Sequence, residues 1–329
     1  MKRKKNSLPE PREDRFQIRA YKEKDWIGLK DLLREYLRLS PEDEARDDRE
    51  LALQMKRPGF YPREDIFVAI SQGKIAGFLQ MIREVSIGRL IFDIFVSPPF
   101  RCNGLGTEFL KTALKRKNVE DLSCLHHCVS QENRAGAESF LLKRGFRLAR
   151  SFQIMETDLS LLWRGEKPSD SIRDGCFQPG DEGKLASLQN RIFINSWGFC
   201  PNTPQEISYY LALTRCSLDE IMVLHGKKGV EGYVWPHFID LPESRSHIKK
   251  CRIHMFGVLL DFRRKGRGRM LLSSALSWIK EMGYRFLELT VDDQNKAAIC
   301  LYRSLGFKNK ERLYWYENNH IGVCKFERK

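Results

Sequence analysis

The sequence contains two copies of one pattern, and this repeat constrains the fold more than any other feature. The segment VSPPFRCNGLGTEFLKTAL (96–114) aligns with VLLDFRRKGRGRMLLSSAL (258–276), an offset of 162 residues. Downstream, VSQENRAGAESFLLKRGF (129–146) aligns with VDDQNKAAICLYRSLGF (291–307), with one residue gained or lost inside the match. A repeat of this kind indicates one folding unit present twice, and a chain of 329 residues has room for two domains.

Each copy reads as the same series of elements. A strand leads through a polar turn into an amphipathic helix at 18–37 and 172–192, and a β-hairpin follows at 67–79 and 222–234. A long strand, the glycine loop, a helix, a strand, a second helix and a final strand or hairpin complete the copy. We therefore predict an α/β fold of two tandem domains, each a mixed, twisted sheet flanked by helices. The expected boundaries are a basic polar tail (1–15), an N-terminal domain (16–158), a linker (159–170) and a C-terminal domain (171–329).

Charge and cysteine content narrow the class of partner and the compartment. Lys and Arg outnumber Asp and Glu by 57 to 43, which favours an anionic partner such as a nucleotide cofactor, an acidic metabolite, RNA or a membrane surface. The basic N-terminal stretch lacks the apolar core of a signal peptide, and no apolar run approaches the roughly 20 residues of a membrane helix. Nine scattered cysteines suit reduced thiols better than a disulfide framework. The expectation is a cytoplasmic protein with no membrane partner.

The glycine loop of each copy lies between a buried strand and an amphipathic helix. The first amides of such a helix lack backbone partners and lie at the positive end of the helix dipole, where a diphosphate binds well. Gly266 and Gly268 are expected to permit positive φ and close backbone approach, and Arg263 with its neighbours to add charge. The first copy, RCNGLG (101–106), has lost most of this charge but has kept the arginine and both glycines. This retention favours a phosphate cradle over a solvated basic run.

The loop and the downstream motif together resemble the GNAT superfamily of acyl-CoA N-acetyltransferases. That family carries (Arg/Gln)-x-x-Gly-x-(Gly/Ala) after its fourth strand, and the downstream match consists of Asn295, Ala298, Leu301, Tyr302, Leu305, Gly306 and Phe307. Both halves carry the resemblance, and the tandem layout is similar to that of the mycothiol synthases. The resemblance implies that the pantetheine arm of acetyl-CoA lies in a V-shaped gap between the fourth and fifth strands, with the pyrophosphate on the loop. It also implies direct acetyl transfer to an amine, without a covalent enzyme intermediate.

The resemblance assigns two sets of cofactor-binding residues. In the second half these are Val258, Leu260, Arg263, Arg264, Gly266, Arg267, Gly268, Arg269 and Asn295. In the first half they are Val96, Arg101, Asn103, Gly104, Leu105, Gly106 and Asn133.

Direct attack on a thioester needs a neutral amine, an oxyanion donor and a proton for the leaving thiolate. Tyr302 lies at the family's general-acid position, whereas the first half has Leu141 there, so the second half is expected to be catalytic and the first half degenerate. His254 and Glu288 are the candidates for the base, and Asp93 lies near the equivalent place in the first half. The oxyanion donor is expected to be a backbone N–H near Val258, at a strand bulge.

Two further features have competing interpretations. In CLHHC (124–128) alternation places Cys124, His126 and Cys128 on one strand face, but no second ligand pair is close in sequence, so no metal site is predicted. The basic stretch ESRSHIKKCRIH (243–254), with Lys249, Lys250 and Arg252, either favours an acceptor carrying carboxylate or phosphate or is a charged hairpin facing water.

Three classes of function remain from the sequence. The first is an acetyl-CoA-dependent N-acetyltransferase acting on the primary amine of a small molecule, and the second is a protein or peptide N-acetyltransferase. The third is a non-catalytic acyl-CoA sensor or nucleic-acid-binding module, which the presence of Tyr302 with both glycines disfavours. The expected partners are acetyl-CoA and an amine acceptor, and either a monomer or a homodimer is compatible with the repeat.

Overall fold

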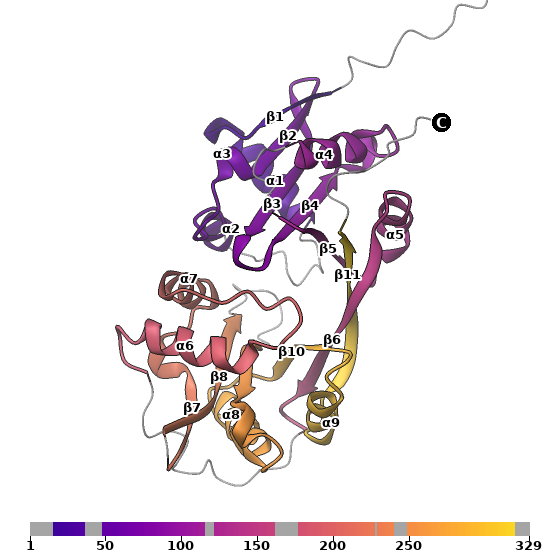
Figure 1. Cartoon of the computed structure of the whole chain (residues 1–329). Coiled ribbons are helices and arrows are strands. Elements are labelled where there is room, and N and C mark those ends of the chain that lie inside the picture. Colours follow the sequence, from indigo (N-terminus) through magenta and orange to yellow (C-terminus); the bar gives the residue numbers. More distant parts are fainter. Residues whose placement is uncertain are drawn as a thin grey trace, which may run out of the picture.

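The structure is a computed structural model that describes residues 16–36, 48–115, 122–161, 177–227, 229–239 and 249–319. The predicted tail at 1–15, most of the predicted linker and the first strand expected near residue 172 lie outside these residues. Figure 1 shows two lobes, each with its own part of the sheet and its own helices, joined by two long strands. Within the described ranges, no helix combines the length and the apolar character needed to cross a bilayer.

The first half builds most of one lobe. Its strands are β1 (Gln17–Ala20), β2 (Ile66–Ser71), β3 (Lys74–Glu84), β4 (Arg89–Val96), β5 (Cys124–Ser130) and β6 (Arg147–Asp158). Its helices are α1 (Trp26–Tyr36), α2 (Asp48–Gln54), α3 (Pro62–Asp65), α4 (Leu105–Leu114) and α5 (Arg134–Leu142).

The second half repeats this series. Its strands are β7 (Met222–Gly226), β8 (Gly229–Ile239), β9 (Lys250–Val258), β10 (Phe286–Asp292) and β11 (Lys308–Asn318). Its helices are α6 (Glu182–Phe193), α7 (Pro204–Thr214), α8 (Arg267–Glu281) and α9 (Lys296–Ser304). The predicted α/β class is confirmed, because the part of the sheet in each half is mixed. The pairs β4–β5 and β9–β10 are parallel, and the other pairs of described strands are antiparallel.

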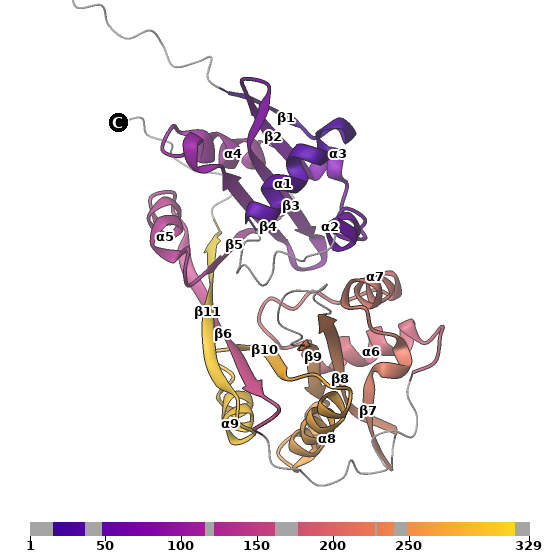
Figure 2. The same ribbon diagram turned by 180° about the vertical axis from the view of Figure 1, so that it is seen from behind.

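The strand order reveals an exchange that the repeat alone does not show. The eleven strands of the described residues form one sheet in the order β1-β2-β3-β4-β5-β11-β6-β10-β9-β8-β7. The last strand of the first half, β6, pairs with β10 of the second half, and the last strand of the second half, β11, pairs with β5 of the first. The two exchanged strands also pair with each other, and in both views they run between the lobes (Figures 1 and 2).

Each exchanged strand contributes to the core of the other half. Met155 of β6 is fully buried in the cluster formed by β9, α8, β10 and α9, and Tyr316 of β11 is fully buried in the cluster around β4, β5 and α4. Leu159, the first residue of the predicted linker, is also fully buried in the second-half cluster. Burying a side chain of this size contributes roughly 1.5–3 kcal/mol, so each sheet depends on a strand from the opposite half of the sequence.

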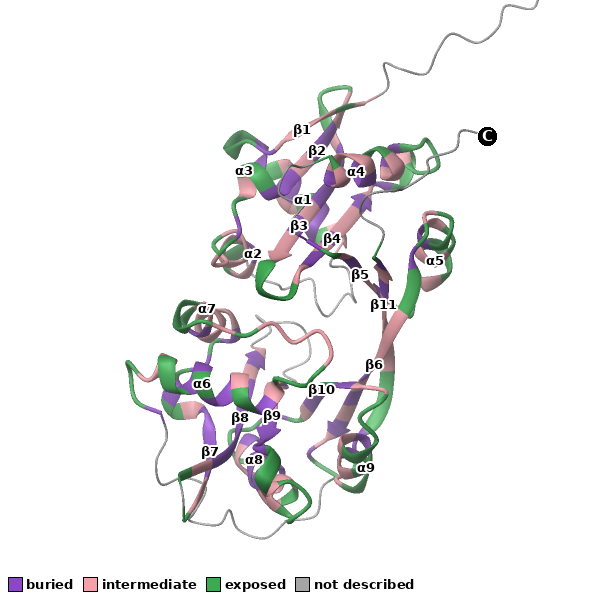
Figure 3. Ribbon diagram, viewed as in Figure 1, coloured by how far each residue is buried: buried purple, intermediate pink, exposed green. Residues whose placement is uncertain are grey.

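Strand periodicity explains how both faces of the second sheet are covered. Tyr233 and Trp235 of β8 belong to the cluster under α6 and α7, whereas Val234 between them belongs to the cluster under α8. Successive side chains of a strand point to opposite faces, so a central strand covered on both sides is apolar throughout. Figure 3 accordingly shows β8 buried along much of its length, while the outward faces of the helices are exposed.

Candidate active site

Strands β9 and β10 diverge at the centre of the second half. They pair in parallel only where Lys250–Arg252 meets Phe286–Glu288. Beyond that point their backbones no longer pair, and β10 is held from its other side by β6 along its whole length. The first half has the same geometry, because β4 and β5 pair only where Arg89–Ile91 meets Cys124–His126. Both halves therefore have the gap between fourth and fifth strands that the family resemblance implies.

The glycine loops of the two halves share one backbone conformation. Arg264 and Gly266 have φ of 60° and 75°, and their counterparts Cys102 and Gly104 have φ of 60° and 87°. Gly266 and Gly104 are the N-caps of α8 and α4, and neither helix start is capped by a side chain. No atom lies within 4 Å of a Cβ placed on Gly266, so glycine is favoured there by the left-handed backbone and not by lack of space. Gly266 is exposed and no side chain caps the start of α8, as a site for a diphosphate requires.

Gly268 differs from the expectation of positive φ. It lies inside the first turn of α8, and a Cβ there would make ordinary contacts of 3.6 Å with Leu301 and Phe256. Neither the backbone conformation nor the packing within the described residues therefore requires glycine at this position.

Arg263 hydrogen-bonds the loop to the end of β9 and to α6. Its Nε donates to the carbonyl of Val258 at 2.9 Å and its Nη2 to the carbonyl of Ile192 at 2.8 Å. Arg101 makes the same bond in the first half, from Nε to the carbonyl of Val96 at 2.9 Å. The arginine shared by both copies therefore stabilises the turn, which explains why it is present even where the neighbouring charges are missing.

The other basic side chains of the second loop differ in whether they form hydrogen bonds or ion pairs within the fold. Arg267 forms an ion pair of 2.9 Å with the buried Glu231, Lys265 donates to the carbonyl of Asp261 at 2.8 Å, and Arg269 donates to Ser304 at 2.6 Å. Arg264 is exposed and makes no hydrogen bond or ion pair within the described part of the chain. Arg264 is thus the side chain best placed to meet an anion at the start of α8.

The remaining predicted cofactor-binding residues occupy the ends of the same elements. Asn295 caps α9 by accepting from the amide of Ala298 at 3.1 Å, and Asn133 precedes α5 and donates to Ser130 at 3.1 Å. Leu260 is exposed in the turn after β9. In the first loop Asn103 is exposed, Leu105 is buried where the second loop has Arg267, and Gly106 packs against Phe140.

Tyr302 lies buried on α9 with its ring against Phe256 of β9 and against Phe307, at centroid distances of 6.2 and 5.9 Å. Burial raises the pKa of Tyr302 well above its usual value, so the phenol is protonated at neutral pH. Its hydroxyl has no hydrogen-bond partner among the residues that the structure describes. Leu141 is buried at the corresponding place on α5, followed like Tyr302 by an exposed residue. Tyr302 therefore meets the first requirement of a proton donor, and Leu141 cannot.

The bulge in β9 falls at His254 and not near Val258. Trp235 pairs with Met255 and Pro236 with Ile253, so His254 is the residue that the register skips, whereas β4 pairs with β3 without interruption. The imidazole packs against Trp235 at 4.8 Å and Tyr210 at 5.2 Å between ring centroids. Burial, together with the charge of Arg252, lowers the pKa of His254 to about 4. His254 is therefore neutral at pH 7 and can accept a hydrogen bond, but it is a weak proton acceptor.

Glu288 lies at the closed end of the gap, opposite Arg252. Its buried carboxylate lies 2.5 Å from Lys310, 3.0 Å from Lys250 and 3.1 Å from Arg252. Burial acts to raise the pKa of Glu288, but the hydrogen bond from Lys310 and the charges of Arg252 and Lys250 outweigh it and hold the pKa at about 2. These contacts give Glu288 the role of an ion-pair centre that ties β9, β10 and β11 together, and they make it a poor general base.

The basic stretch expected at 243–254 is described only from residue 249. Lys250 and Arg252 are engaged with Glu288, and the ammonium of Lys249 lies 5.6 Å from the centre of the Tyr284 ring. These contacts account for three of its charges within the fold, and residues 243–248 lie outside the described part.

A polar network in the first-half gap was not found from the sequence. The hydroxyl of Tyr36 donates to Asp93 at 2.9 Å, and Nδ1 of His127 lies 3.4 Å from the same carboxylate and 2.7 Å from the carbonyl of Phe92. Burial and then the charge of Asp93 raise the pKa of Tyr36 well above its usual value. The carboxylate near the equivalent of the base position is thus held by its neighbours, and no local motif connects Tyr36 to residues 93 and 127.

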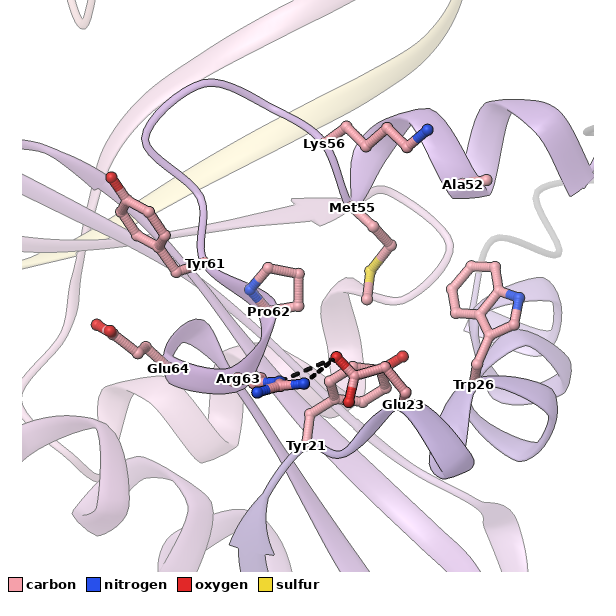
Figure 4. Close-up of a pocket in the computed structure, with 10 residues that line it drawn as sticks. All are labelled: Tyr21, Glu23, Trp26, Ala52, Met55, Lys56, Tyr61, Pro62, Arg63 and Glu64. Atoms are coloured by element: carbon pink, nitrogen blue, oxygen red, sulfur yellow. Dashed lines mark hydrogen bonds and ion pairs between the residues drawn. The ribbon is translucent and has the colours of Figure 1, made fainter.

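A separate cavity of about 450 Å³ lies in the first half, between the end of β1, α2 and α3 (Figure 4). Tyr21, Trp26 and Met55 form its apolar wall, and the ion pair of Arg63 with Glu23, at 2.7 Å, lies at its side. None of the predicted site residues lines it.

Comparison with known proteins identifies the family. Residues 189–307 match the acetyltransferase (GNAT) family, and residues 62–148 match the acetyltransferase (GNAT) domain. The chain belongs to the GNAT acetyltransferases. It carries two GNAT domains in tandem, and the family uses acetyl-CoA as cosubstrate.

Similar proteins include members with the same tandem layout. The chain is 24% identical to the mycothiol acetyltransferase of Amycolatopsis mediterranei over 261 residues, which are 77% of this chain and 84% of that protein. The fold is similar to that of a GCN5-related N-acetyltransferase from Sphaerobacter thermophilus, with a TM-score of 0.67, 20% identity and coverage of 95% and 96% of the two chains. It is also similar to a tandem GNAT protein from the clavulanic acid biosynthesis pathway, with a TM-score of 0.64, 13% identity and coverage of 92% and 98%.

Proposed function

We propose that the second half of this GNAT acetyltransferase transfers an acetyl group to the primary amine of a small molecule, and that the first half does not catalyse the reaction. The observation that carries this proposal is the buried ring of Tyr302 packed against Phe256 of β9, where the first half has Leu141 at the corresponding place.

The second half offers the groups needed to hold acetyl-CoA. The uncapped amides at the start of α8 and the exposed Arg264 would bind the pyrophosphate, and the divergence of β9 from β10 would admit the pantetheine arm. The cosubstrate supplies the activated thioester. The backbone amides of β9 around the bulge at His254 are the candidates for the oxyanion donor, because a bulge leaves ladder groups unpaired.

In this proposal one side chain donates a proton and another orients the amine. Tyr302 donates its phenolic proton to the departing thiolate, because burial keeps the phenol protonated. His254, neutral because burial lowers its pKa to about 4, accepts a hydrogen bond from the incoming neutral amine and orients it. The proton that the nitrogen loses as the amide forms passes to solvent, and solvent returns a proton to the Tyr302 phenolate. Glu288 takes no part in the chemistry, because three cations already engage its carboxylate.

Two observations favour a small acceptor. The similarity to mycothiol acetyltransferase extends over most of the chain, and α7, which carries Tyr210 beside His254, packs against α2 of the first half. A side of the site that is covered by another element leaves less room for an extended peptide. A protein or peptide acceptor is the second candidate, since the GNAT chemistry would be the same.

The test is a screen of amines with acetyl-CoA, read by release of free CoA thiol and by mass spectrometry of the acceptor. We expect at least one small primary amine to gain an acetyl group with the wild-type chain and with Leu141→Met, and far less with Tyr302→Phe. Acetylation of peptides alone would favour the second candidate. Binding of acetyl-CoA without turnover on any amine would indicate a non-catalytic acyl-CoA sensor. Binding of nucleic acid with a steep loss of affinity in salt would indicate a nucleic-acid-binding module.

A further inference from the structure

The exchange of β11 into the first half brings a carboxylate from near the C-terminal end beside two side chains of β5. Cys124 and His126 alternate on β5, so they share one face of the strand. Glu317 of β11 is the register partner of His126. The sequence pattern placed Cys124, His126 and Cys128 on one strand face and predicted no metal site, whereas the structure adds a carboxylate from the other end of the chain.

Two of the distances between the three side chains match those of a tetrahedral metal site. Sγ of Cys124 lies 3.5 Å from Nε2 of His126, and Nε2 lies 3.3 Å from Oε2 of Glu317. With zinc bonds of about 2.3 Å to sulfur and about 2.05 Å to nitrogen or oxygen, tetrahedral angles place S and N about 3.5 Å apart and N and O about 3.4 Å apart. All three ligand atoms lie within 4.8 Å of one another. The two separations that involve Nε2 therefore fit one tetrahedral ion.

Neighbouring side chains hold the three ligands in place, but one ring nitrogen of His126 has no hydrogen-bond partner among the described residues. The ring of Trp197 lies 5.4 Å and that of Trp315 6.1 Å from the imidazole, and Arg147 binds the other oxygen of Glu317 at 2.8 Å. The imidazole of His126 is buried, and its Nδ1 has no hydrogen-bond partner within the described residues, whereas its Nε2 alone faces both the thiol and the carboxylate. An ion bound at Nε2 would replace the contacts of this nitrogen with the thiol and the carboxylate, whereas Nδ1 would stay without a partner among the described residues.

We propose that Cys124, His126 and Glu317 bind a zinc ion that fastens the exchanged strand β11 to β5. Thiolate, imidazole and carboxylate in a tetrahedral arrangement suit zinc better than magnesium or calcium, which prefer more oxygen ligands. The thiol proton leaves to solvent when the Zn–S bond forms, and the two anionic ligands neutralise the 2+ charge. The side-chain oxygen of Asn319, which accepts a hydrogen bond from the thiol at 3.0 Å, loses that donor and becomes the fourth ligand.

The test measures metal binding directly and does not depend on acetyl transfer. The full chain is stripped with a chelator, then titrated with Zn²⁺ and, separately, with Co²⁺ as a spectroscopic probe. We expect one zinc per chain, a rise in Tm on adding zinc, and a cobalt spectrum with a thiolate charge-transfer band. Cys124→Ser and Glu317→Gln should each weaken zinc binding at least tenfold, whereas Cys128→Ser, on the same strand but outside the cluster, should bind like the wild type.

Three results would overturn the proposal. They are no zinc bound at micromolar concentrations, a cobalt complex without the thiolate band, and equal zinc content in the wild type and all three variants, which would identify an adventitious ion. Because Cys124→Ser could disturb folding, the isosteric Glu317→Gln with an unchanged circular dichroism spectrum serves as the second variant, and retention of full zinc affinity there also counts against the site.

Discussion

The two halves of the chain have nearly the same loop backbone and different chemistry. Both loops adopt left-handed φ at matching positions, and in both an arginine donates to the carbonyl five residues before it. The second loop adds Arg264, Lys265 and Arg267 where the first has Cys102, Asn103 and Leu105. The arginine that stabilises the turn is therefore present in both copies. The additional basic residues are present only in the copy that also has Tyr302.

The fourth strands of the two halves differ in one residue with a large effect. β4 pairs with β3 without interruption, whereas β9 contains the bulge at His254. A bulge turns one side chain out of the alternation and unpairs part of the ladder, which is a common feature next to active sites. The comparison predicts that catalysis depends on residues peculiar to the second half, and the following substitutions test it.

The largest effect is expected from the proton donor. Tyr302→Phe keeps the ring but removes the hydroxyl, so kcat should fall about 100-fold with little change in Tm. Leu141→Met, a volume-conserving change at the matching position, should leave kcat within twofold. Steady-state kinetics with acetyl-CoA measure both. Because the pKa of Tyr302 is raised, its ionisation should produce no decline in kcat up to pH 10 in the wild type; equal kcat for Tyr302→Phe and wild type would refute the assignment.

The closed end of the second-half gap should be a stability determinant. Glu288→Gln leaves Lys250, Arg252 and Lys310 without their shared anion, and the free energy of unfolding at pH 7 should fall by about 2 kcal/mol. The folded pKa of about 2 lies below the ordinary 4.5, so this contribution is present above pH 4.5 and is lost as the pH falls toward 2.

Urea unfolding at several pH values measures this difference. The difference in the free energy of unfolding between Glu288→Gln and the wild type should decrease as the pH is lowered from 4.5 to 2. Glu281→Gln, at the exposed end of α8, is the matched control and should cost less than about 0.5 kcal/mol. A difference that stays constant with pH would show that the ion pairs are not its source.

The loop backbone should matter for acetyl-CoA only in the second half. Alanine at a left-handed position costs about 1 kcal/mol of backbone strain, so Gly266→Ala should displace the amides at the start of α8 and raise KM for acetyl-CoA about tenfold. Gly104→Ala introduces the same strain into the first loop and should change KM at least threefold less. Comparable increases from both substitutions would indicate that both halves bind the reacting cosubstrate.

The smallest effect is expected from loop charge. Arg264→Ala removes an exposed cation without breaking an internal contact, so KM for acetyl-CoA should rise about threefold at low salt, less at high salt, with Tm unchanged. Arg263→Ala should instead lower Tm, because it breaks the bonds to Val258 and Ile192. Kinetics at two ionic strengths and thermal melts separate the two arginines; an unchanged KM for Arg264→Ala would contradict its proposed contact with the anion.

The site could be predicted from the sequence wherever local pattern determines geometry. The Gly266 loop, the start of α8 and the burial of Tyr302 follow from residue types at fixed spacing. Long-range contacts could not be predicted in this way. Nothing near Arg263 in sequence indicates Ile192, and nothing near Glu288 indicates Lys310. The repeat held one signal for Arg263: an arginine present in both loops, when the other charges differ, indicates a structural bond.

The duplicated α/β unit follows from local sequence patterns alone, because strand alternation, helical spacing and glycine turns act over a few residues at a time. That β6 completes the sheet of the second half and β11 that of the first became visible only in the folded chain. Backbone hydrogen bonds do not distinguish one apolar strand from its duplicate. Which edge each last strand joins depends on how the whole chain packs, and that choice places Glu317 beside His126.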